Sequence, residues 1–333
     1  MTNTEILKQY NLHENIALKP LLYSTEEEWH KLRRGGIGGS DVGAVLGLNE
    51  YMSPLQVYKS KVDTIVKEVD NVYVKKGHDL ESVIREKYVV PELASKGYKV
   101  LPVEHTLVNN TYPWLRANLD GIAIPKEGDY SNNIVIEIKW VSEYGESKWD
   151  SENSICGVPP SYYAQVQMYM LVTGTKFAIV CALFDRTWEM KYYKIRRDVE
   201  FMEKMVSKTK TFWTLNVEMR MPPIYSATLD KADIAEDIKK EVVIVEDESM
   251  NYDVAQYKRL TKDLKNLEKE VNTMKDIIVT KFMEGKRPTS PLCKVSISTY
   301  TTKRFDSAKF KEDHPDEYNN YVKENTVTKI DIK

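Results

Sequence analysis

Short apolar runs dominate the middle of the chain, and segments with helical spacing flank them. Between residues 98 and 140 these runs are rich in β-branched residues and predict strands, with the polar segment 126–133 as a hairpin connection. The apolar run 177–184 and the segment 188–195 predict two more strands. Helical spacing occupies segments 24–30, 54–66, 78–96, 159–173 and about 198–216. This order of elements predicts an α/β fold with a central mixed β-sheet flanked by helices.

Pro222 and Pro223 divide the chain into a larger and a smaller part. We expect one domain over residues 1–225, opening with a helical lead-in, and an appendage over residues 226–333. In the appendage, apolar residues at alternating steps of four and three predict a heptad-patterned helix over about 252–284. These residues are Leu260, Leu264, Leu267, Val271, Met274 and Ile278. Short strands and a charged tail are expected after it. The stripe fits an intramolecular helical hairpin, which we expect, an oligomer contact, or a docking site for a partner.

Composition narrows the chemistry. Apolar residues make up 42% of the chain, charged residues 29%, and the net charge is −2, so any nucleic-acid site requires a local basic cleft. No run approaches the roughly 18 apolar residues of a membrane helix, and the first residues lack a secretory pattern. We therefore expect no membrane association and a cytoplasmic location. The three scattered cysteines suit neither a disulfide framework nor a four-thiolate site. Metal ligands would therefore be carboxylates, which favour Mg²⁺ or Mn²⁺.

One block of residues carries potential chemistry: Asp120, followed by Glu137, Ile138 and Lys139. Alternate side chains of a strand share a face, so Glu137 and Lys139 point one way and the neighbouring isoleucines the other. Cross-strand pairing can bring Asp120 beside Glu137, where a divalent cation would relieve the repulsion between two carboxylates. The lysine would then act as a general base with a lowered pKa. The spacing alone favours a plainer interpretation, an amphipathic strand with a surface Glu–Lys pair.

Five segments together resemble the lambda-exonuclease/YqaJ-type viral recombinase family of the PD-(D/E)xK nuclease superfamily. The first is the Asp…Glu-x-Lys block. The others are TrpHisLysLeuArgArgGlyGlyIleGlyGlySerAsp at 29–41, GlyHisAspLeuGlu at 77–81, AlaAsnLeuAspGly at 117–121 and TyrTyrAlaGlnValGlnMetTyrMet at 162–170. They follow the family's order and cover about residues 24–215. The resemblance implies a restriction-endonuclease-like core with a central mixed sheet, to which the helical and small β appendage is added.

The resemblance also implies a metal site. Asp120 and Glu137 match its carboxylate ligands, and the backbone carbonyl of Ile138 is a further ligand. Glu81 matches a helix carboxylate that reaches the metal, although alone it would more often be a solvated helix residue. Lys139 matches the motif lysine. These four side chains, with Gln165, form the expected catalytic set.

A second group of residues matches the family's DNA contacts. Arg33 and Ser40 correspond to residues that hold the 5′-terminal phosphate, and an arginine fork beside a glycine-rich helix start suits a phosphate. The plainer interpretation is that Ser40 or Asp41 caps a helix and the glycines make a turn. Gln165 and Tyr169 share one helix face and match a Gln-x-x-x-Tyr element that contacts phosphate. Asn118 stands where some relatives carry serine, which puts its DNA contact in doubt.

The activity implied by the resemblance is a Mg²⁺-dependent 5′→3′ exonuclease on linear double-stranded DNA, with Mn²⁺ as a substitute. Its 3′ single-stranded overhang would serve annealing-type phage recombination, with an annealing protein and a homo-oligomeric ring as expected partners. The scattered cysteines disfavour a helicase-associated iron–sulfur nuclease, and the chain lacks the G-x-x-x-x-G-K-[ST] motif, so neither an iron–sulfur cluster nor a nucleotide cofactor is expected. Two alternatives stay open: another PD-(D/E)xK endonuclease, and a non-catalytic protein that binds DNA ends.

Overall fold

The computed structural model describes residues 2–12, 17–63, 72–127, 132–237, 247–283 and 301–322. Its helices are α1 (Asn3–Gln9), α2 (Glu26–Arg34), α3 (Gly39–Val45), α4 (Pro54–Val62), α5 (Val72–Ile84), α6 (Val90–Ser95), α7 (Pro160–Thr173), α8 (Val199–Thr211), α9 (Lys231–Asp237), α10 (Glu248–Met283), α11 (Ser307–Asp313) and α12 (Pro315–Tyr321). Its strands are β1 (Leu18–Leu21), β2 (Ile37–Gly38), β3 (Tyr98–Leu101), β4 (Thr106–Asn109), β5 (Leu115–Arg116), β6 (Gly121–Pro125), β7 (Ile134–Val141), β8 (Phe177–Phe184) and β9 (Glu189–Arg196). The chain divides into two compact units, Met1–Ile234 and Ala235–Lys333.

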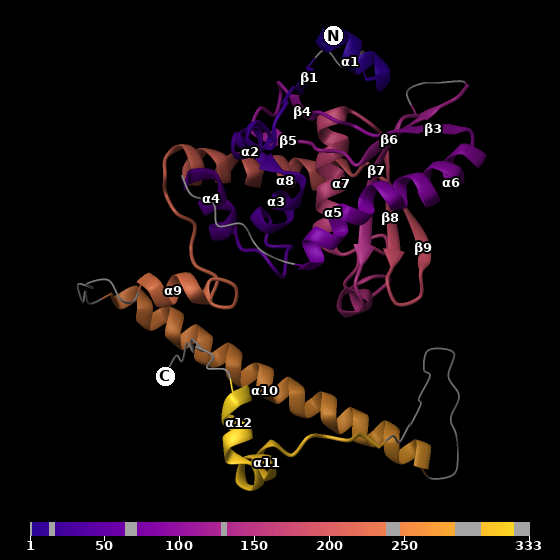
Figure 1. Cartoon of the computed structure of the whole chain (residues 1–333). Coiled ribbons are helices and arrows are strands. Elements are labelled where there is room, and N and C mark those ends of the chain that lie inside the picture. Colours follow the sequence, from indigo (N-terminus) through magenta and orange to yellow (C-terminus); the bar gives the residue numbers. More distant parts are fainter. Residues whose placement is uncertain are drawn as a thin grey trace. The chain divides into compact units, whose positions relative to one another are not determined.

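A five-stranded mixed sheet forms the centre of the first unit (Figure 1). Its order is β3-β6-β7-β8-β9, in which β7 and β8 are parallel and the other neighbours are antiparallel. The parallel pair is joined by a crossover through α7, as a parallel connection requires. This arrangement confirms the α/β fold with a central mixed sheet that the element order predicts.

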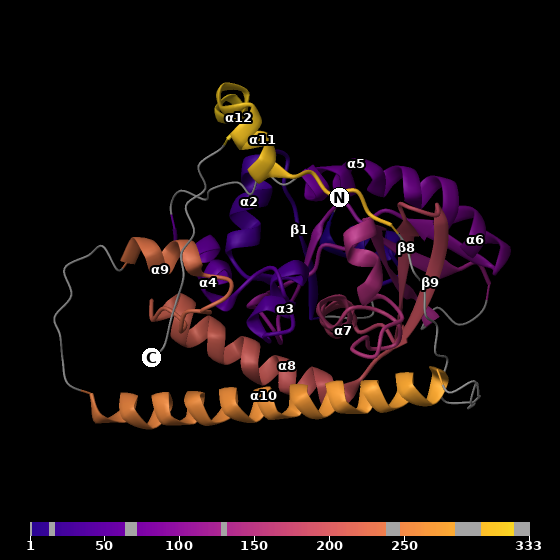
Figure 2. The same cartoon turned by 90° about the horizontal axis from the view of Figure 1, so that it is seen from below.

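The two faces of the sheet belong to separate cores. The isoleucines 134, 136 and 138 of β7 pack with residues of α5 and α6, among them Ile84 and Leu93. Val135, on the opposite face, packs with α7 and the N-terminal elements. In Figure 2 β8 and β9 accordingly lie between α5–α6 and α7. The alternation expected for β7 is confirmed, but its polar face is covered rather than open to solvent, because α7 packs on it.

Helix α3 and the short strands β4 and β5 pack beside α7. The short strands β2 and β5 pair in parallel, and the Ile37 amide donates to the Trp114 carbonyl at 2.7 Å. Helix α3 follows β2 directly and packs on α7, where a Cβ added at Gly43 would lie 2.9 Å from the side chain of Ser161. Strands β1 and β4 form a second two-stranded sheet. The glycine-rich segment therefore allows close helix packing as well as a turn.

The helix expected over 78–96 differs from the observed one at its start. Helix α5 begins at Val72 and includes Gly77, and the helical path continues through a π-helical turn, Arg85–Val89, into α6. It ends before Gly97, whose φ of 84° is the left-handed conformation that favours glycine. Packing of the helix on the isoleucine face outweighs the roughly 1 kcal/mol that a glycine costs inside a helix.

The first unit extends past the double proline, to Ile234, whereas the sequence places the boundary at residue 225. Asp230 explains the extension, because it is fully buried and accepts hydrogen bonds from the Ser53 hydroxyl and, at 2.7 Å, from the Ser226 amide. Asp233 pairs with Lys59 of α4 in the same region. Polar contacts with residues more than 170 positions away therefore hold the segment after the prolines against α4. Contacts of this kind produce no local pattern in the sequence.

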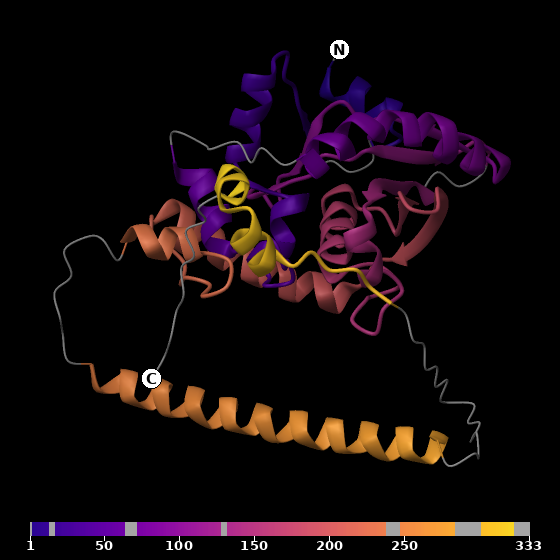
Figure 3. The same ribbon diagram turned by 60° about the horizontal axis from the view of Figure 1, so that its bottom comes forward.

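Beyond the end of α9, the described residues of the second unit form one long helix and two short ones. Helix α10 has 36 residues (Figure 3), and the six residues of its apolar stripe are between 47% and 60% exposed. Helices α11 and α12 pack on each other, with the rings of Phe310 and His314 stacked at 5.1 Å. The described residues therefore form the predicted helix without the intramolecular hairpin expected to cover its stripe. The short strands expected after it lie outside the described residues. Among the described helices, none is both long and apolar enough to cross a membrane.

Candidate active site

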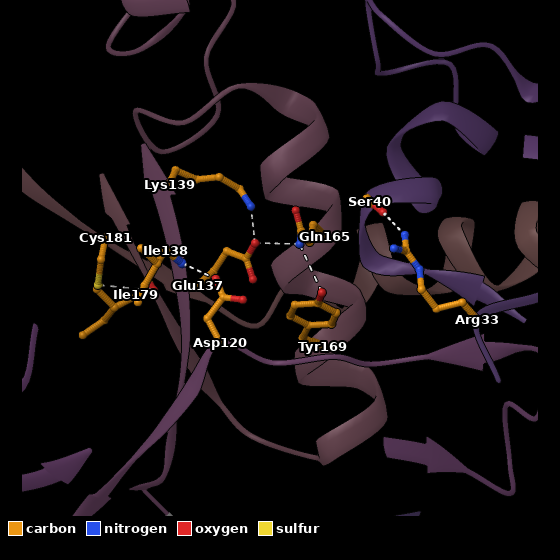
Figure 4. A network of polar contacts seen from close by, with 10 residues as sticks. All are labelled: Arg33, Ser40, Asp120, Glu137, Ile138, Lys139, Gln165, Tyr169, Ile179 and Cys181. Carbon is orange, nitrogen blue, oxygen red and sulfur yellow. Dashed lines mark hydrogen bonds and ion pairs between the residues drawn. The ribbon is translucent and has the colours of Figure 1, made fainter. Parts of the chain in front are cut away.

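The register of the β6–β7 hairpin places two acidic residues side by side. Gly121 of β6 pairs with Ile136 of β7, so Asp120, one residue before β6, comes opposite Glu137. The Ile138 amide donates to Asp120 Oδ2 at 2.6 Å, which fixes this carboxylate against β7 (Figure 4). The juxtaposition expected from the sequence is therefore present, and it results from backbone register.

Glu137 is buried, with 1% of its surface exposed, and its two oxygens differ in their surroundings. Oε1 accepts from the Lys139 ammonium and, at 2.7 Å, from Gln165 Nε2 of α7. Oε2 is buried with no hydrogen-bond partner. An unsatisfied buried carboxylate oxygen is costly. This oxygen is therefore the natural position for a cation that is not a protein side chain.

The site holds more negative charge than its protein partners neutralise. Burial and the nearby Asp120 raise the pKa of Glu137 from 4.5 to about 8. Burial and the Glu81 carboxylate raise the pKa of Asp120 from 3.8 to about 7. Glu137 and Asp120 also raise the pKa of the Lys139 ammonium, against the effect of its burial. The raised pKa of Lys139 belongs to the site without a metal ion, where two carboxylates face the ammonium; the lowered pKa expected beside a bound metal ion stays a prediction.

Glu81 approaches the same site from α5. Its pKa is raised by burial and by Glu137, so the two carboxylates interact. Its oxygen lies 3.8 Å from the Arg85 guanidinium, which also donates to the Asp120 carbonyl at 3.1 Å. The sequence reasoning missed Arg85, although its i, i+4 spacing from Glu81 was a usable signal.

Arg33 and Ser40 meet at the junction of α2 and α3. Arg33 Nη2 donates to the Ser40 hydroxyl at 3.2 Å, and the guanidinium lies over the ring of Trp29 at 4.8 Å. Ser40 is exposed, so the pair is open to a ligand. The N-cap of α3 is Gly38, and the capping carboxylate is Asp41, whose Oδ2 accepts from the Gly38 amide at 2.8 Å. Of the two residues that the plainer interpretation allowed as the cap, Asp41 makes the capping contact of α3 and Ser40 does not.

Tyr169 connects this junction to the acidic site. Its hydroxyl accepts from Gln165 Nε2 at 3.1 Å, and the same amide reaches Glu137. A Cβ built on Gly39 would lie 2.3 Å from the Tyr169 hydroxyl, so only glycine fits there. The Oδ1 atom of Asn118, two positions before Asp120, accepts a hydrogen bond from the Thr106 hydroxyl at 2.6 Å.

The oxygen donors suit a hard divalent cation, although no complete cage is preformed. Within the described ranges, no group of three or more His, Cys, Asp or Glu side chains is arranged to hold a metal ion. Glu81 therefore does not complete a three-carboxylate set with Asp120 and Glu137. The carboxylates of Asp120 and Glu137, the latter with its unsatisfied Oε2, nevertheless fit Mg²⁺, which usually takes one or two carboxylates and keeps its waters.

The fold and the site resemble those of PD-(D/E)xK nucleases: a mixed sheet whose central hairpin presents Asp…Glu-x-Lys beside a helix carrying Gln165. Residues 28–176 match the model of the YqaJ-like viral recombinase domain. The chain is also 24% identical over 323 residues to the uncharacterized protein YqaJ of Bacillus subtilis (strain 168), covering 93% of this chain and 94% of that protein. The match over residues 28–176 confirms the resemblance to this family.

Two solved structures are similar to the chain. The alkaline exonuclease LHK-Exo from Laribacter hongkongensis has a TM-score of 0.45 and 20% identity, covering 64% of this chain and 100% of its own. The phage-related exonuclease from Haemophilus somnus 129PT has a TM-score of 0.40 and 14% identity, covering 57% of this chain and 99% of its own.

Proposed function

We propose that the protein is a Mg²⁺-dependent exonuclease that degrades one strand of linear double-stranded DNA in the 5′→3′ direction. The observation that carries this proposal is the pairing of Asp120 and Glu137 with an unsatisfied buried oxygen, next to Lys139. Such an arrangement is costly without a cation and gives it a ready site. The YqaJ-like recombinase domain supports a role in DNA processing.

In this proposal each residue of the site has a separate task. Asp120, Glu137, the Ile138 carbonyl and Glu81 of α5 would hold the metal ion. A bound Mg²⁺, or Mn²⁺ in its place, polarises the scissile phosphate and lowers the pKa of a coordinated water. Lys139 orients the attacking water. Gln165 fixes the Glu137 side chain through Oε1, so that Oε2 stays available.

A pocket for the terminal phosphate sets the polarity of degradation. Arg33 and Ser40 bind the 5′-phosphate, since a guanidinium and a hydroxyl already lie within hydrogen-bond distance of each other on an exposed surface. Tyr169 and Gln165 join this pocket to the metal site, and Asn118 offers its amide to the same strand. Removal of nucleotides from the 5′ end leaves a 3′ single-stranded overhang, the substrate of an annealing protein in recombination.

The experiment compares the wild type with Glu137→Ala and Lys139→Ala on a 5′-phosphorylated linear duplex, in Mg²⁺ and in Ca²⁺. Mononucleotide release in Mg²⁺, lost in both variants, supports the exonuclease. Cleavage of closed circular DNA would instead indicate an endonuclease, and tight binding without turnover an end-binding protein. Labels at the 5′ and the 3′ end establish which terminus is released first.

A homo-oligomeric ring and an annealing partner belong to the same proposal. The heptad stripe of α10 is exposed along its length, and a helix of this kind is stabilised when a second apolar helix covers it. We assign the stripe to contact with a second copy of the chain in the oligomer.

A further inference from the structure

A buried ion pair lies directly beneath the proposed phosphate pocket. Lys61 Nζ of α4 contacts Asp41 Oδ2 of α3 at 2.6 Å, and their side chains are only 4% and 7% exposed. The same ammonium donates to the Arg33 carbonyl at 3.1 Å. Lys61 thus touches both segments that supply the pocket, the end of α2 with Arg33 and the start of α3 with Ser40.

The Asp41 carboxylate is an anion at a place where an anion would hinder binding of phosphate. Although burial opposes ionisation, Lys61 and Arg33 hold the pKa of Asp41 below its usual value, so the side chain is charged at neutral pH. It is retained because it caps α3 through the Gly38 amide. It also interacts electrostatically with Arg33, the group that would bind the phosphate. Left uncompensated, this carboxylate would repel a DNA phosphate and compete for the guanidinium.

We propose that Lys61 is a positioning residue that neutralises Asp41 and thereby leaves Arg33 available to the terminal phosphate. The inference rests on the proposed function of Arg33 and Ser40, and it assigns the affinity of their pocket to a buried charge that never touches DNA. Lys61 lies on α4, 20 positions from Asp41. The pocket therefore depends on a residue outside segment 29–41, which contains Arg33 and Ser40.

Two roles for Lys61 make different predictions. If Lys61 acts through its charge, the affinity for a 5′-phosphate follows the net charge of the Lys61–Asp41 pair. If Lys61 acts only by holding the Arg33 carbonyl in place through a hydrogen bond, any variant that lacks the ammonium loses affinity for the 5′-phosphate. The double variant Lys61→Met/Asp41→Asn separates the two roles, because it removes the hydrogen bond to the Arg33 carbonyl and keeps the net charge of the pair at zero.

The experiment measures the dissociation constants of 3′-fluorescein duplexes with a 5′-phosphate or a 5′-hydroxyl, by anisotropy in Ca²⁺, for the full chain. The readout is the ratio of the two constants. We expect Lys61→Met to lower the preference for phosphate on the order of tenfold and Asp41→Asn to raise it by a similar factor, as a unit charge does at a partly buried site. The double variant should return to the wild-type ratio.

Several outcomes would overturn this inference. If the double variant had as low a preference for phosphate as Lys61→Met, Lys61 would act only through its hydrogen bond to the Arg33 carbonyl. A wild type without any preference for phosphate would refute the assignment of Arg33 and Ser40 as a phosphate pocket. Should Lys61→Met not fold, which thermal unfolding would reveal, the other two variants still test the inference when each is compared with the wild type. Charge neutralisation predicts a raised preference in Asp41→Asn and a wild-type preference in the double variant, whereas a purely mechanical role predicts a wild-type preference in Asp41→Asn and a lowered one in the double variant. Failure of the proposed nuclease is recognised separately, as absence of Mg²⁺-dependent degradation by the wild type.

Discussion

Replacing Glu137 by Gln should stabilise the metal-free protein while abolishing its activity. The change removes one negative charge from a buried site and keeps the size of the side chain, so that the effect on folding reflects charge. In the fold the pKa of this carboxyl is about 8, against 4.5 when it is free, because of burial and the neighbouring Asp120. Since each pKa unit is worth about 1.4 kcal/mol, the ionised carboxylate costs on the order of 5 kcal/mol.

The sign of the pH dependence follows from proton binding. Between pH 4.5 and about 8 the folded protein retains a proton at Glu137 that the unfolded chain has lost. The free energy of unfolding therefore falls as the pH rises through this window. Below pH 4.5 the carboxyl is protonated in both states, and the wild type and Glu137→Gln should have similar stability.

Urea unfolding in EDTA at pH 5.5 and pH 8.5 tests this prediction. We expect the stability advantage of Glu137→Gln over the wild type to grow by about 2 to 4 kcal/mol between the two pH values. Glu152→Gln serves as the control, because Glu152 is exposed. Equal pH dependence in the wild type and Glu137→Gln would refute the reasoning that the buried carboxylates are strained without a metal.

Three further predictions concern other parts of the molecule. Mg²⁺ affinity should rise from pH 6 to pH 8 with release of about one proton from the Asp120–Glu137 pair, which calorimetry in buffers of different ionisation enthalpy detects; pH-independent affinity would contradict this. Gly39→Ala should lower kcat/KM on the order of 100-fold by displacing Tyr169, whereas the control Gly77→Ala, with open space around it, should not. Changing Leu264 and the neighbouring stripe residue at position 267 to lysine should convert the oligomer to monomer in sedimentation; an unchanged distribution would exclude the stripe.

The sequence predicted the sheet well because its strands carry strong local signals. The continuous apolar run of β8 and the alternation in β7 each identify a strand, and the order of elements suffices for a mixed sheet. The hairpin register then follows from pairing, which brings Asp120 to Glu137. The start of α5 was missed because Gly77 is a helix breaker by propensity alone, and tertiary packing overrides it.

The site was less predictable wherever its properties depend on distant residues. Glu137 is buried because α7 covers its face, and the pKa of Lys139 is raised because two carboxylates converge on it. Neither fact appears in a strand pattern. Lys61 lies 20 positions from Asp41 and outside every motif, so no local sequence pattern identifies it. The sequence therefore identifies the residues that lie in the five family-like segments, but not a residue such as Lys61 that positions them from another element.

The most direct test of the central claim is the position of a metal ion. A crystal grown with Mn²⁺ and measured near the manganese absorption edge locates the ion by its anomalous signal. We predict a peak within about 2.0 to 2.3 Å of carboxylate oxygens of both Asp120 and Glu137, lost in Glu137→Gln. A peak bound elsewhere, or none in a preparation that is active with Mn²⁺, would contradict the account.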